Sequence, residues 1–137
     1  MKVLLDTSAF IALFVKEEPS HSKVSEKYLS YKQQRALLLT SDYILDELYT
    51  RLMYDFGKNI TKQKIETLTD SIEKGELKIL SIDEAIFKKA TAVFTKYAEH
   101  KISFTDATTY VLYKDFAIDE IFTLDRDFKR MRAKTSF

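Results

Sequence analysis

The 137-residue sequence predicts an α/β fold with a short parallel sheet. Short apolar runs of strand length alternate along the chain with longer segments of helical periodicity, a pattern typical of parallel sheets covered by helices. Only two glycines and one proline are present, which disfavours a turn-rich all-β fold. A hydrophobic content of 45% is enough for a buried core, and the length suits one domain.

The first three elements are a strand and two helices. Lys2–Leu5 is a short apolar run and is expected to form a buried strand. Ser8–Val15 predicts a short helix, with large apolar residues at Phe10, Ile11, Leu13 and Phe14. Pro19 marks the break before Ser20–Lys32, where apolar residues recur at helical spacing. The chain therefore begins in the order strand, helix, helix.

A second strand and two further helices occupy the middle of the chain. Ala36–Thr40 is an apolar run of strand length. Ser41–Phe56 has a continuous apolar stripe, and Gly57 suits the C-terminal end of that helix. Thr61–Lys74 repeats the helical spacing before Gly75. We expect two successive helices between the second and third strands.

The last part of the chain supplies two more strands and two helices. Leu77–Leu80 is the third expected strand. Ser81 and Glu84 have the spacing of a capping box and predict the start of a helix that extends to about residue 97. Thr105–Phe116 predicts the next helix, and Glu120–Leu124 the fourth strand.

Composition excludes several classes of protein. Without cysteine there is no disulfide framework, zinc–thiolate site or cysteine nucleophile. No apolar run approaches the roughly 20 residues that span a bilayer, and Asp6 interrupts the N-terminal apolar run too early for a signal peptide. We therefore expect a cytoplasmic protein that has no membrane partner.

The charge is unevenly distributed. The chain has 22 Lys and Arg against 21 Asp and Glu, a net charge of +1, which by itself gives no argument for a nucleic-acid partner. Residues 1–125 carry 17 basic and 20 acidic residues, whereas residues 126–137 carry five basic and one acidic. The basic C-terminal segment, with Arg126, Lys129, Arg130 and Arg132, is either an ordinary solvated terminus or a rim that contacts phosphates.

Four acidic residues occupy positions where α/β proteins place their sites. Asp6 follows the first strand, Asp125 follows the fourth, Asp106 lies in the first turn of a helix, and Glu47 lies in the helix after the second strand. Each has a structural alternative as a helix cap, turn residue or solvated side chain. Periodicity does not choose between Glu47 and its neighbour Asp46.

If these carboxylates converge, they need a cation between them. Like charges held close together do not all stay ionised unless something neutralises them. Mg²⁺ and Mn²⁺ prefer oxygen ligands, and such ions lower the pKa of bound water and stabilise charge on phosphoryl oxygens. The set predicts a Mg²⁺ (or Mn²⁺) site suited to phosphodiester hydrolysis.

The order of these motifs resembles that of the PIN domain family. The resemblance covers nearly the whole chain and rests on four segments, VLLDTSAF at Val3–Phe10, SDYILDEL at Ser41–Leu48, SFTDA at Ser103–Ala107 and IFTLDRDF at Ile121–Phe128. It implies one PIN domain over residues 1–137, with a PIN-like, Rossmann-like three-layer fold and four to five parallel strands flanked by helices.

The resemblance also implies a function. PIN domains are Mg²⁺- or Mn²⁺-dependent ribonucleases, and small stand-alone members are most often VapC-type toxins of type II toxin–antitoxin pairs. Carried over by position, Asp6 and Asp106 would bind the metal, and Glu47 and Asp125 would complete the catalytic set. Supporting roles would fall to Ser8, Thr123 and Asp127. Expected partners are RNA, a cognate antitoxin and a second copy of the chain.

Two other functions and one departure stay open at this point. A PIN-like RNA-binding or RNA-processing module without a toxin role is the first alternative, and a receiver-type signalling domain is the second. The family usually has a glycine and a short last strand after the fourth motif, and residues 129–137 lack that glycine. The apolar side chains Phe10, Phe14, Tyr28 and Tyr49 are candidates for a partner groove or a homodimer face.

Overall fold

Four parallel strands form one sheet in the order β3-β2-β1-β4 in the computed structural model, which describes all 137 residues. The elements are β1 (Lys2–Leu5), α1 (Thr7–Phe14), α2 (His21–Gln33), β2 (Leu37–Ser41), α3 (Asp42–Glu73), β3 (Lys78–Leu80), α4 (Glu84–Lys96), a 3₁₀ turn (Ala98–His100), α5 (Phe104–Asp115), β4 (Glu120–Phe122) and α6 (Asp127–Arg130). The predicted α/β class is confirmed.

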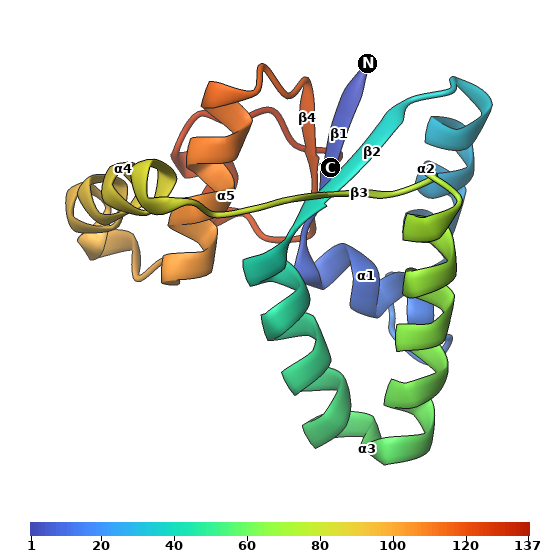
Figure 1. Ribbon diagram of the computed structural model, residues 1–137. Coiled ribbons are helices and arrows are strands. Elements are labelled where there is room, and N and C mark those ends of the chain that lie inside the picture. The colour runs from blue at the N-terminus through green and yellow to red at the C-terminus, as the bar shows by residue number, and fades with distance from the viewer.

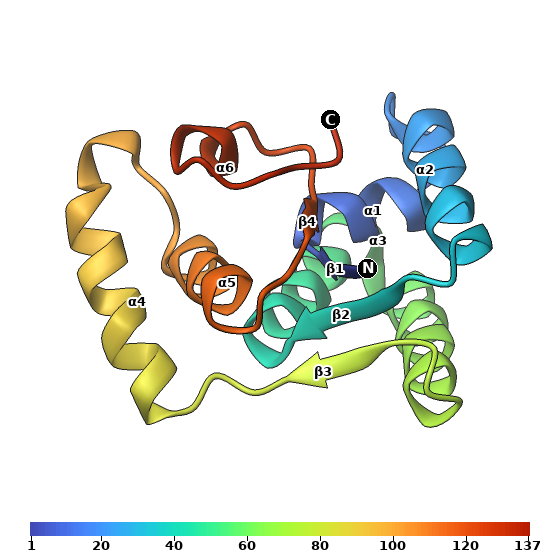
Figure 2. The ribbon, with the colours of Figure 1, turned by 90° about the horizontal axis from the view of Figure 1, so that it is seen from above.

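The sheet is the middle of three layers. Helices α4 and α5 lie on one side of it, and α1, α2 and α3 lie on the other (Figures 1 and 2). The central strand β1 pairs with β2 and β4, so Leu4 lies between Leu39 and Ile121. All three side chains are buried, as expected for strands covered on both faces. The carboxyl ends of all four strands point to the same edge, where a functional site is expected.

Helix α3 bends sharply at Gly57. Residues 42–56 and 58–73 form two arms of a V below the sheet (Figure 1). Gly57 has φ of 82°, a left-handed conformation that favours glycine, and the Thr61 hydroxyl donates to the Gly57 carbonyl at 2.8 Å. The expected end of the first helix at Gly57 is confirmed, and the second arm begins a few residues earlier than predicted.

The predicted capping box at Ser81 and Glu84 is wrong. Asp83 is the N-cap of α4, and its carboxylate accepts from the Ile86 backbone N–H at 2.9 Å. An aspartate one residue before the helix reaches this donor directly, so Ser81 is not needed. A true capping box begins α5 instead, between Ser103 and Asp106. The fourth strand is also shorter than predicted and ends at Phe122.

The C-terminal segment continues the sheet edge without the family's usual glycine. Ile121 of β4 bridges to Thr135 in parallel, with the Ile121 N–H donating to the Lys134 carbonyl at 2.9 Å and the Ser136 N–H donating to the Ile121 carbonyl at 3.1 Å. The segment therefore adds a minimal fifth position to the sheet.

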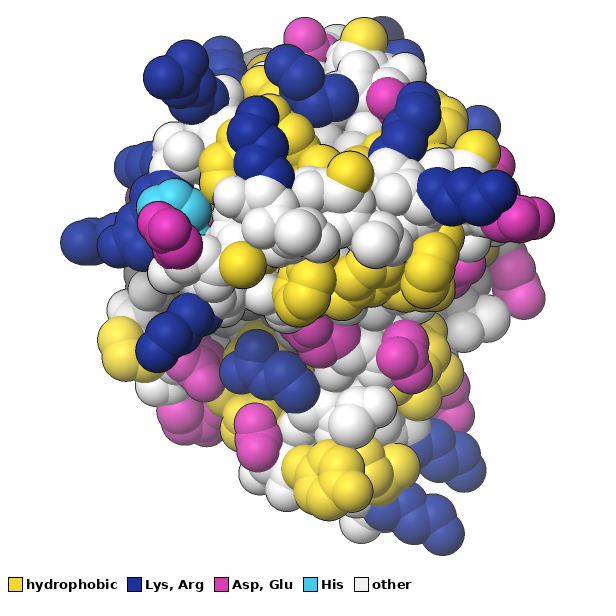
Figure 3. Space-filling view, turned by 90° about the vertical axis from the view of Figure 1, so that its left-hand side faces the viewer, with side chains coloured by type: hydrophobic (Ala, Val, Ile, Leu, Met, Phe, Trp, Pro, Cys, Tyr) yellow, Lys and Arg dark blue, Asp and Glu magenta, His cyan; other side chains and the backbone are white.

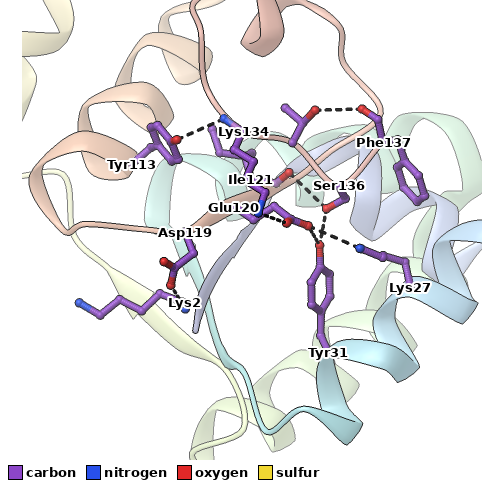
Figure 4. A network of polar contacts seen from close by, with 11 residues as sticks. Lys2, Lys27, Tyr31, Tyr113, Asp119, Glu120, Ile121, Lys134, Ser136 and Phe137 are labelled. Atoms are coloured by element: carbon purple, nitrogen blue, oxygen red, sulfur yellow. Dashed lines mark hydrogen bonds and ion pairs between the residues drawn. The ribbon is translucent and has the colours of Figure 1, made fainter.

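A buried polar network holds this segment in place (Figure 4). Glu120 is 5% exposed and accepts a hydrogen bond from the Tyr31 hydroxyl, which also contacts the Ser136 hydroxyl at 2.5 Å. Lys27 and Lys134 lie 3.7 and 3.6 Å from the same carboxylate. Burial raises the pKa of Tyr31, so the phenol stays a donor to Glu120. The network joins α2, β4 and the C-terminus.

No helix of the structure combines the length and apolar character needed to cross a membrane.

Candidate active site

Asp6 lies at the centre of the site, at the carboxyl end of β1. It occupies the N-cap position of α1, yet its side chain makes no capping hydrogen bond. The carboxylate instead accepts from the Thr123 hydroxyl at 2.9 Å and from the Ser8 hydroxyl at 3.4 Å. Only 4% of Asp6 is exposed. The capping role that the sequence left open is therefore excluded, and the side chain is held for another purpose.

Ser8 and Thr123 form a hydroxyl pair that connects the first turn of α1 to the segment after β4. Their oxygens lie 3.1 Å apart. Ser8 Oγ also accepts from the Leu124 N–H at 2.9 Å, and Thr123 Oγ1 accepts from the Asp125 N–H at 2.9 Å. These bonds fix the turn that follows β4, and the structure places two of the three predicted supporting residues, Ser8 and Thr123, against Asp6.

Asp125 and Asp127 continue this turn. Asp125 Oδ1 accepts from the Asp127 N–H at 2.8 Å, so part of its hydrogen-bonding capacity shapes the loop. Asp127 Oδ1 accepts from Arg130 at 3.2 Å within the short helix α6. Asp127 therefore has a local ionic partner, which favours the structural over the catalytic interpretation of this residue.

Asp106 enters the site from the first turn of α5. Its Oδ2 accepts from the Ser103 backbone N–H at 3.1 Å, while Ser103 Oγ accepts from the Asp106 N–H at 2.9 Å. This reciprocal pair orients the carboxylate and begins the helix. The capping interpretation of Asp106 is confirmed, and its half-buried position near Asp6 is compatible with the predicted role in the acidic site.

The structure separates Glu47 from Asp46. Both lie in the first arm of α3, but Glu47 is half-buried and Asp46 is exposed. Glu47 is close enough to Asp6 to raise its pKa by charge repulsion. The helix therefore directs Glu47, and not its neighbour, toward the cluster, a distinction that periodicity did not make.

The electrostatics of the cluster are those of crowded, buried acids. Burial raises the pKa of Asp6 to about 6, and repulsion from Glu47 and Asp125 adds to the rise, although the hydrogen bond from Thr123 opposes it. Burial raises the pKa of Asp106 to about 7, with repulsion from Asp6 next in importance. Burial also raises the pKa of Asp125. The four predicted acids therefore converge on one region.

The donor set fits a divalent cation that keeps much of its water. Burial is the main cause of the raised pKa values of Asp6 and Asp106 and repulsion between the acids adds to it, so a bound cation would stabilise their ionised forms. No three His, Asp or Glu side chains lie close enough to enclose an ion by themselves. Mg²⁺ typically takes one or two carboxylates and fills its remaining positions with water. Asp6 and Asp106 suit such a site.

The four residues of the predicted basic rim fall into two groups of two. Arg126 and Lys129 line a polar pocket together with Thr123 and Asp125. Arg130 is paired with Asp127, and Arg132 is exposed without lining this pocket. The first pair shares a pocket with Asp125, and Arg130 also lies close enough to Asp125 for its charge to oppose the rise in the pKa of that carboxyl group.

Two apolar surfaces lie away from the acids. Phe10, Phe14 and Tyr28 line a cavity of about 370 Å³ between α1, α2 and the second arm of α3, whereas Tyr49 is half-buried outside it. On the opposite side of the sheet, Figure 3 looks onto the layer of α4 and α5, where a row of hydrophobic side chains crosses the surface. Helix α4 carries two exposed aromatic side chains, Phe87 and Phe94, which are 46% and 40% exposed.

Comparisons with known proteins agree with this arrangement. The chain is 28% identical over 124 residues to Ribonuclease VapC26 of Mycobacterium tuberculosis, and the aligned region covers 90% of this chain and 87% of that relative. The crystal structure of Mycobacterium tuberculosis VapC20, described as a sarcin–ricin loop cleaving toxin, superposes with a TM-score of 0.81 at 19% identity, covering 96% of this chain and 95% of that chain.

Two further solved structures share the fold. VapBC2 from Rickettsia felis, bound to a DNA fragment from its promoter, has a TM-score of 0.71 at 16% identity and covers 99% of this chain and 98% of that chain. FitAcB from Neisseria gonorrhoeae has a TM-score of 0.61 at 17% identity, covering 97% and 95%. A family model described as PIN domain matches residues 3–134. The chain therefore belongs to the PIN domain family.

Proposed function

We propose that this protein is a metal-dependent endoribonuclease and the toxin of a type II toxin–antitoxin pair. The observation that carries the proposal is the convergence of Asp6, Glu47, Asp106 and Asp125 at the carboxyl edge of the sheet, with Asp6 buried and its pKa raised. The similarity to a VapC ribonuclease and to a VapC toxin structure supports the same assignment.

Different residues of the site would contribute to different parts of the hydrolysis. Asp6 and Asp106 would hold Mg²⁺ or Mn²⁺, which when bound lowers the pKa of water and stabilises charge on phosphoryl oxygens. Thr123 and Ser8 keep the Asp6 carboxylate in place through their hydroxyl groups. Glu47 and Asp125 would orient the attacking water and accept its proton. Attack of water on phosphorus breaks the bond to the 3′-oxygen, which takes up a proton, and leaves a 3′-hydroxyl and a 5′-phosphate.

Cleavage assays on matched variants test the assignment. Glu47→Gln removes one charge from the cluster, and Asp46→Asn removes one charge from the exposed side of the same helix turn. We expect Glu47→Gln to lower RNA cleavage with Mg²⁺ or Mn²⁺ by about 10- to 100-fold or more, and Asp46→Asn to leave it unchanged. The opposite ranking would show that the helix presents the other acid to the substrate.

We propose an antitoxin protein as the partner. The apolar cavity bordered by Phe10, Phe14 and Tyr28 suits the apolar side chains of a bound segment. A Lys or Arg of that partner would be attracted to the acidic cluster and would block it. The VapBC2 and FitAcB structures of similar fold support a partner of this kind.

Expression experiments separate a toxin from a housekeeping PIN domain. We expect the chain expressed alone to arrest growth, and co-expression with its neighbouring gene to restore growth. Unimpaired growth with intact RNA cleavage would favour the RNA-processing alternative. The PIN family match leaves the receiver-type alternative without support.

We also propose that the 137 residues act as one unit in the cytoplasm and form a homodimer. The exposed aromatic side chains Phe87 and Phe94 on α4 are the surface best suited to a second copy. Light scattering of wild type and of a Phe87→Ser/Phe94→Ser variant measures this, and a monomeric wild type would contradict it.

A further inference from the structure

A polar pocket of about 360 Å³ lies beside the acidic cluster, between the start of α2 and the C-terminal segment. Its volume falls within the range of about 300–1,000 Å³ that is usual for small-ligand sites. Ser20 and Lys23 contribute from α2, and Thr135 and Phe137 from the C-terminus. The pocket therefore forms only when the two ends of the chain are folded together.

Three cations line this pocket, and none of them has an ionic partner. Lys23, Arg126 and Lys129 form no ion pair, and the only acid among the lining residues is Asp125. By contrast, Arg130 of the same segment is 3.2 Å from Asp127. The pocket thus holds three cations against one carboxylate, and it lies beside the acidic cluster to which Asp125 belongs.

The pocket shares a wall with the acidic site. Thr123 lines the pocket and also donates to Asp6 at 2.9 Å. Asp125 lines it too and is fixed by the Thr123 hydroxyl. The pocket is therefore the cavity next to the acids, and it is open to the next nucleotide of a strand bound there.

The C-terminus contacts Lys23, the one cation of the pocket that lies on α2. Lys23 Nζ lies 4.8 Å from the centre of the Phe137 ring, a distance at which a cation is attracted to an aromatic face. The Phe137 ring packs 6.2 Å from Phe122 of β4. Ser136, beside it, belongs to the buried network around Glu120 (Figure 4). Lys23 is therefore positioned by the ordered C-terminal segment.

We propose that this pocket binds the nucleotide next to the cut in a single-stranded RNA, with its phosphate on Lys23, Arg126 and Lys129. The inference rests on the proposed ribonuclease function and names the contacts through which the substrate is held. Arg and Lys side chains neutralise phosphates and position a strand without reading its sequence. Lys23, outside the C-terminal basic segment, becomes a substrate-binding residue.

Binding of a short, mixed-sequence single-stranded RNA to non-cleaving Asp6→Asn protein tests the proposal. Lys23→Gln and Lys129→Gln are compared in this background with Lys114→Gln, which removes the same charge from the exposed far end of α5. We expect each pocket variant to weaken binding about tenfold. The slope of log K against log salt falls by about 0.7 to 1 for each lysine removed. Lys114→Gln has no effect, and Lys23→Arg restores binding.

The KM and kcat of RNA cleavage, measured without the Asp6→Asn substitution, test the same contacts independently. A contact to a phosphate that does not react strengthens ground-state and transition-state binding alike, so its loss raises KM and leaves kcat little changed. We expect Lys23→Gln and Lys129→Gln to raise KM about tenfold. Unfolding by urea checks that both variants stay as stable as wild type.

The outcomes separate the two proposals. If wild type cleaves RNA but Lys23→Gln, Lys129→Gln and Lys114→Gln bind and cleave alike, the pocket is not a substrate site and the ribonuclease assignment stands. If wild type neither binds nor cleaves RNA, the proposed function fails first. If the pocket variants lose affinity for the antitoxin but not for RNA, the pocket belongs to the protein partner, which overturns the inference.

Discussion

Replacing Asp6 with asparagine should stabilise the metal-free protein. Burial and repulsion raise the pKa of Asp6 from 3.8 to about 6, so the folded protein binds this proton about a hundredfold more tightly than the unfolded chain. Each factor of ten is worth about 1.4 kcal/mol. The ionised carboxylate therefore destabilises the fold by about 3 kcal/mol once the pH is well above 6. The asparagine side chain of the variant would keep an oxygen for the Thr123 hydroxyl and carries no charge.

The pH dependence follows from the direction of this shift. Between pH 3.8 and about 6 the folded state binds more protons than the unfolded state, so the free energy of unfolding falls as the pH rises through this window. We expect the advantage of Asp6→Asn to be about 3 kcal/mol at pH 8 and about half of that at pH 5. Asp106 titrates in both proteins, but its pKa, raised to about 7 in wild type, falls in Asp6→Asn because repulsion from Asp6 contributes to the rise.

Urea unfolding with a chelator present measures these free energies at the two pH values. Asp46→Asn is the matched control, because Asp46 is exposed and a surface substitution of this kind changes stability by about 0.5 kcal/mol or less. An Asp6→Asn protein no more stable than wild type at pH 8, or a difference that does not change with pH, would refute the reasoning.

Three further predictions concern the metal, the buried network and the hydroxyl pair. Mg²⁺ should raise the Tm of wild type more at pH 8 than at pH 5 and should have little effect on Asp6→Asn, since the acids must be ionised to bind it; equal shifts in both proteins would place the ion elsewhere. Tyr31→Phe should lower the free energy of unfolding, measured by urea titration, by about 1.5–3 kcal/mol, because Glu120 loses a buried donor. The control Tyr28→Phe should change it little, because the Tyr28 hydroxyl makes no hydrogen bond. Thr123→Val should lower RNA cleavage about 10- to 100-fold and Thr123→Ser should retain it, since a hydroxyl at this position holds the Asp6 carboxylate; full activity of the valine variant would remove the hydroxyl from the mechanism.

The elements that local pattern determines could be predicted from the sequence. Lys2–Leu5 forms the expected strand, because a short, continuous apolar run is typical of a parallel strand whose two faces are both covered by helices. Gly57 ends the first arm of α3, because its positive φ favours glycine. The acids after β1 and β4 meet because parallel strands end at one edge. The first strand, the end of the first arm of α3 and the approach of these two acids depend on local sequence pattern and topology alone.

The remaining features depend on contacts between distant segments. Glu47 and Asp46 are equivalent in the pattern, and only the packing of α3 directs Glu47 toward Asp6. Glu120 looks like an ordinary strand residue, but its burial with Tyr31 requires the C-terminus to fold against α2. The local sequence around Lys23 does not predict its place in the pocket, because every other lining residue except Ser20 lies about a hundred residues away in the sequence.

Cleavage of RNA in the presence of Mg²⁺ or Mn²⁺ tests the central claim most directly. Wild type, Asp6→Asn and Asp106→Asn are compared with Asp46→Asn, and the ends of the products are identified. The account predicts metal-dependent cleavage by wild type and Asp46→Asn, with 3′-hydroxyl and 5′-phosphate ends, and none above background by the two site variants. Equal cleavage by all four proteins would contradict it.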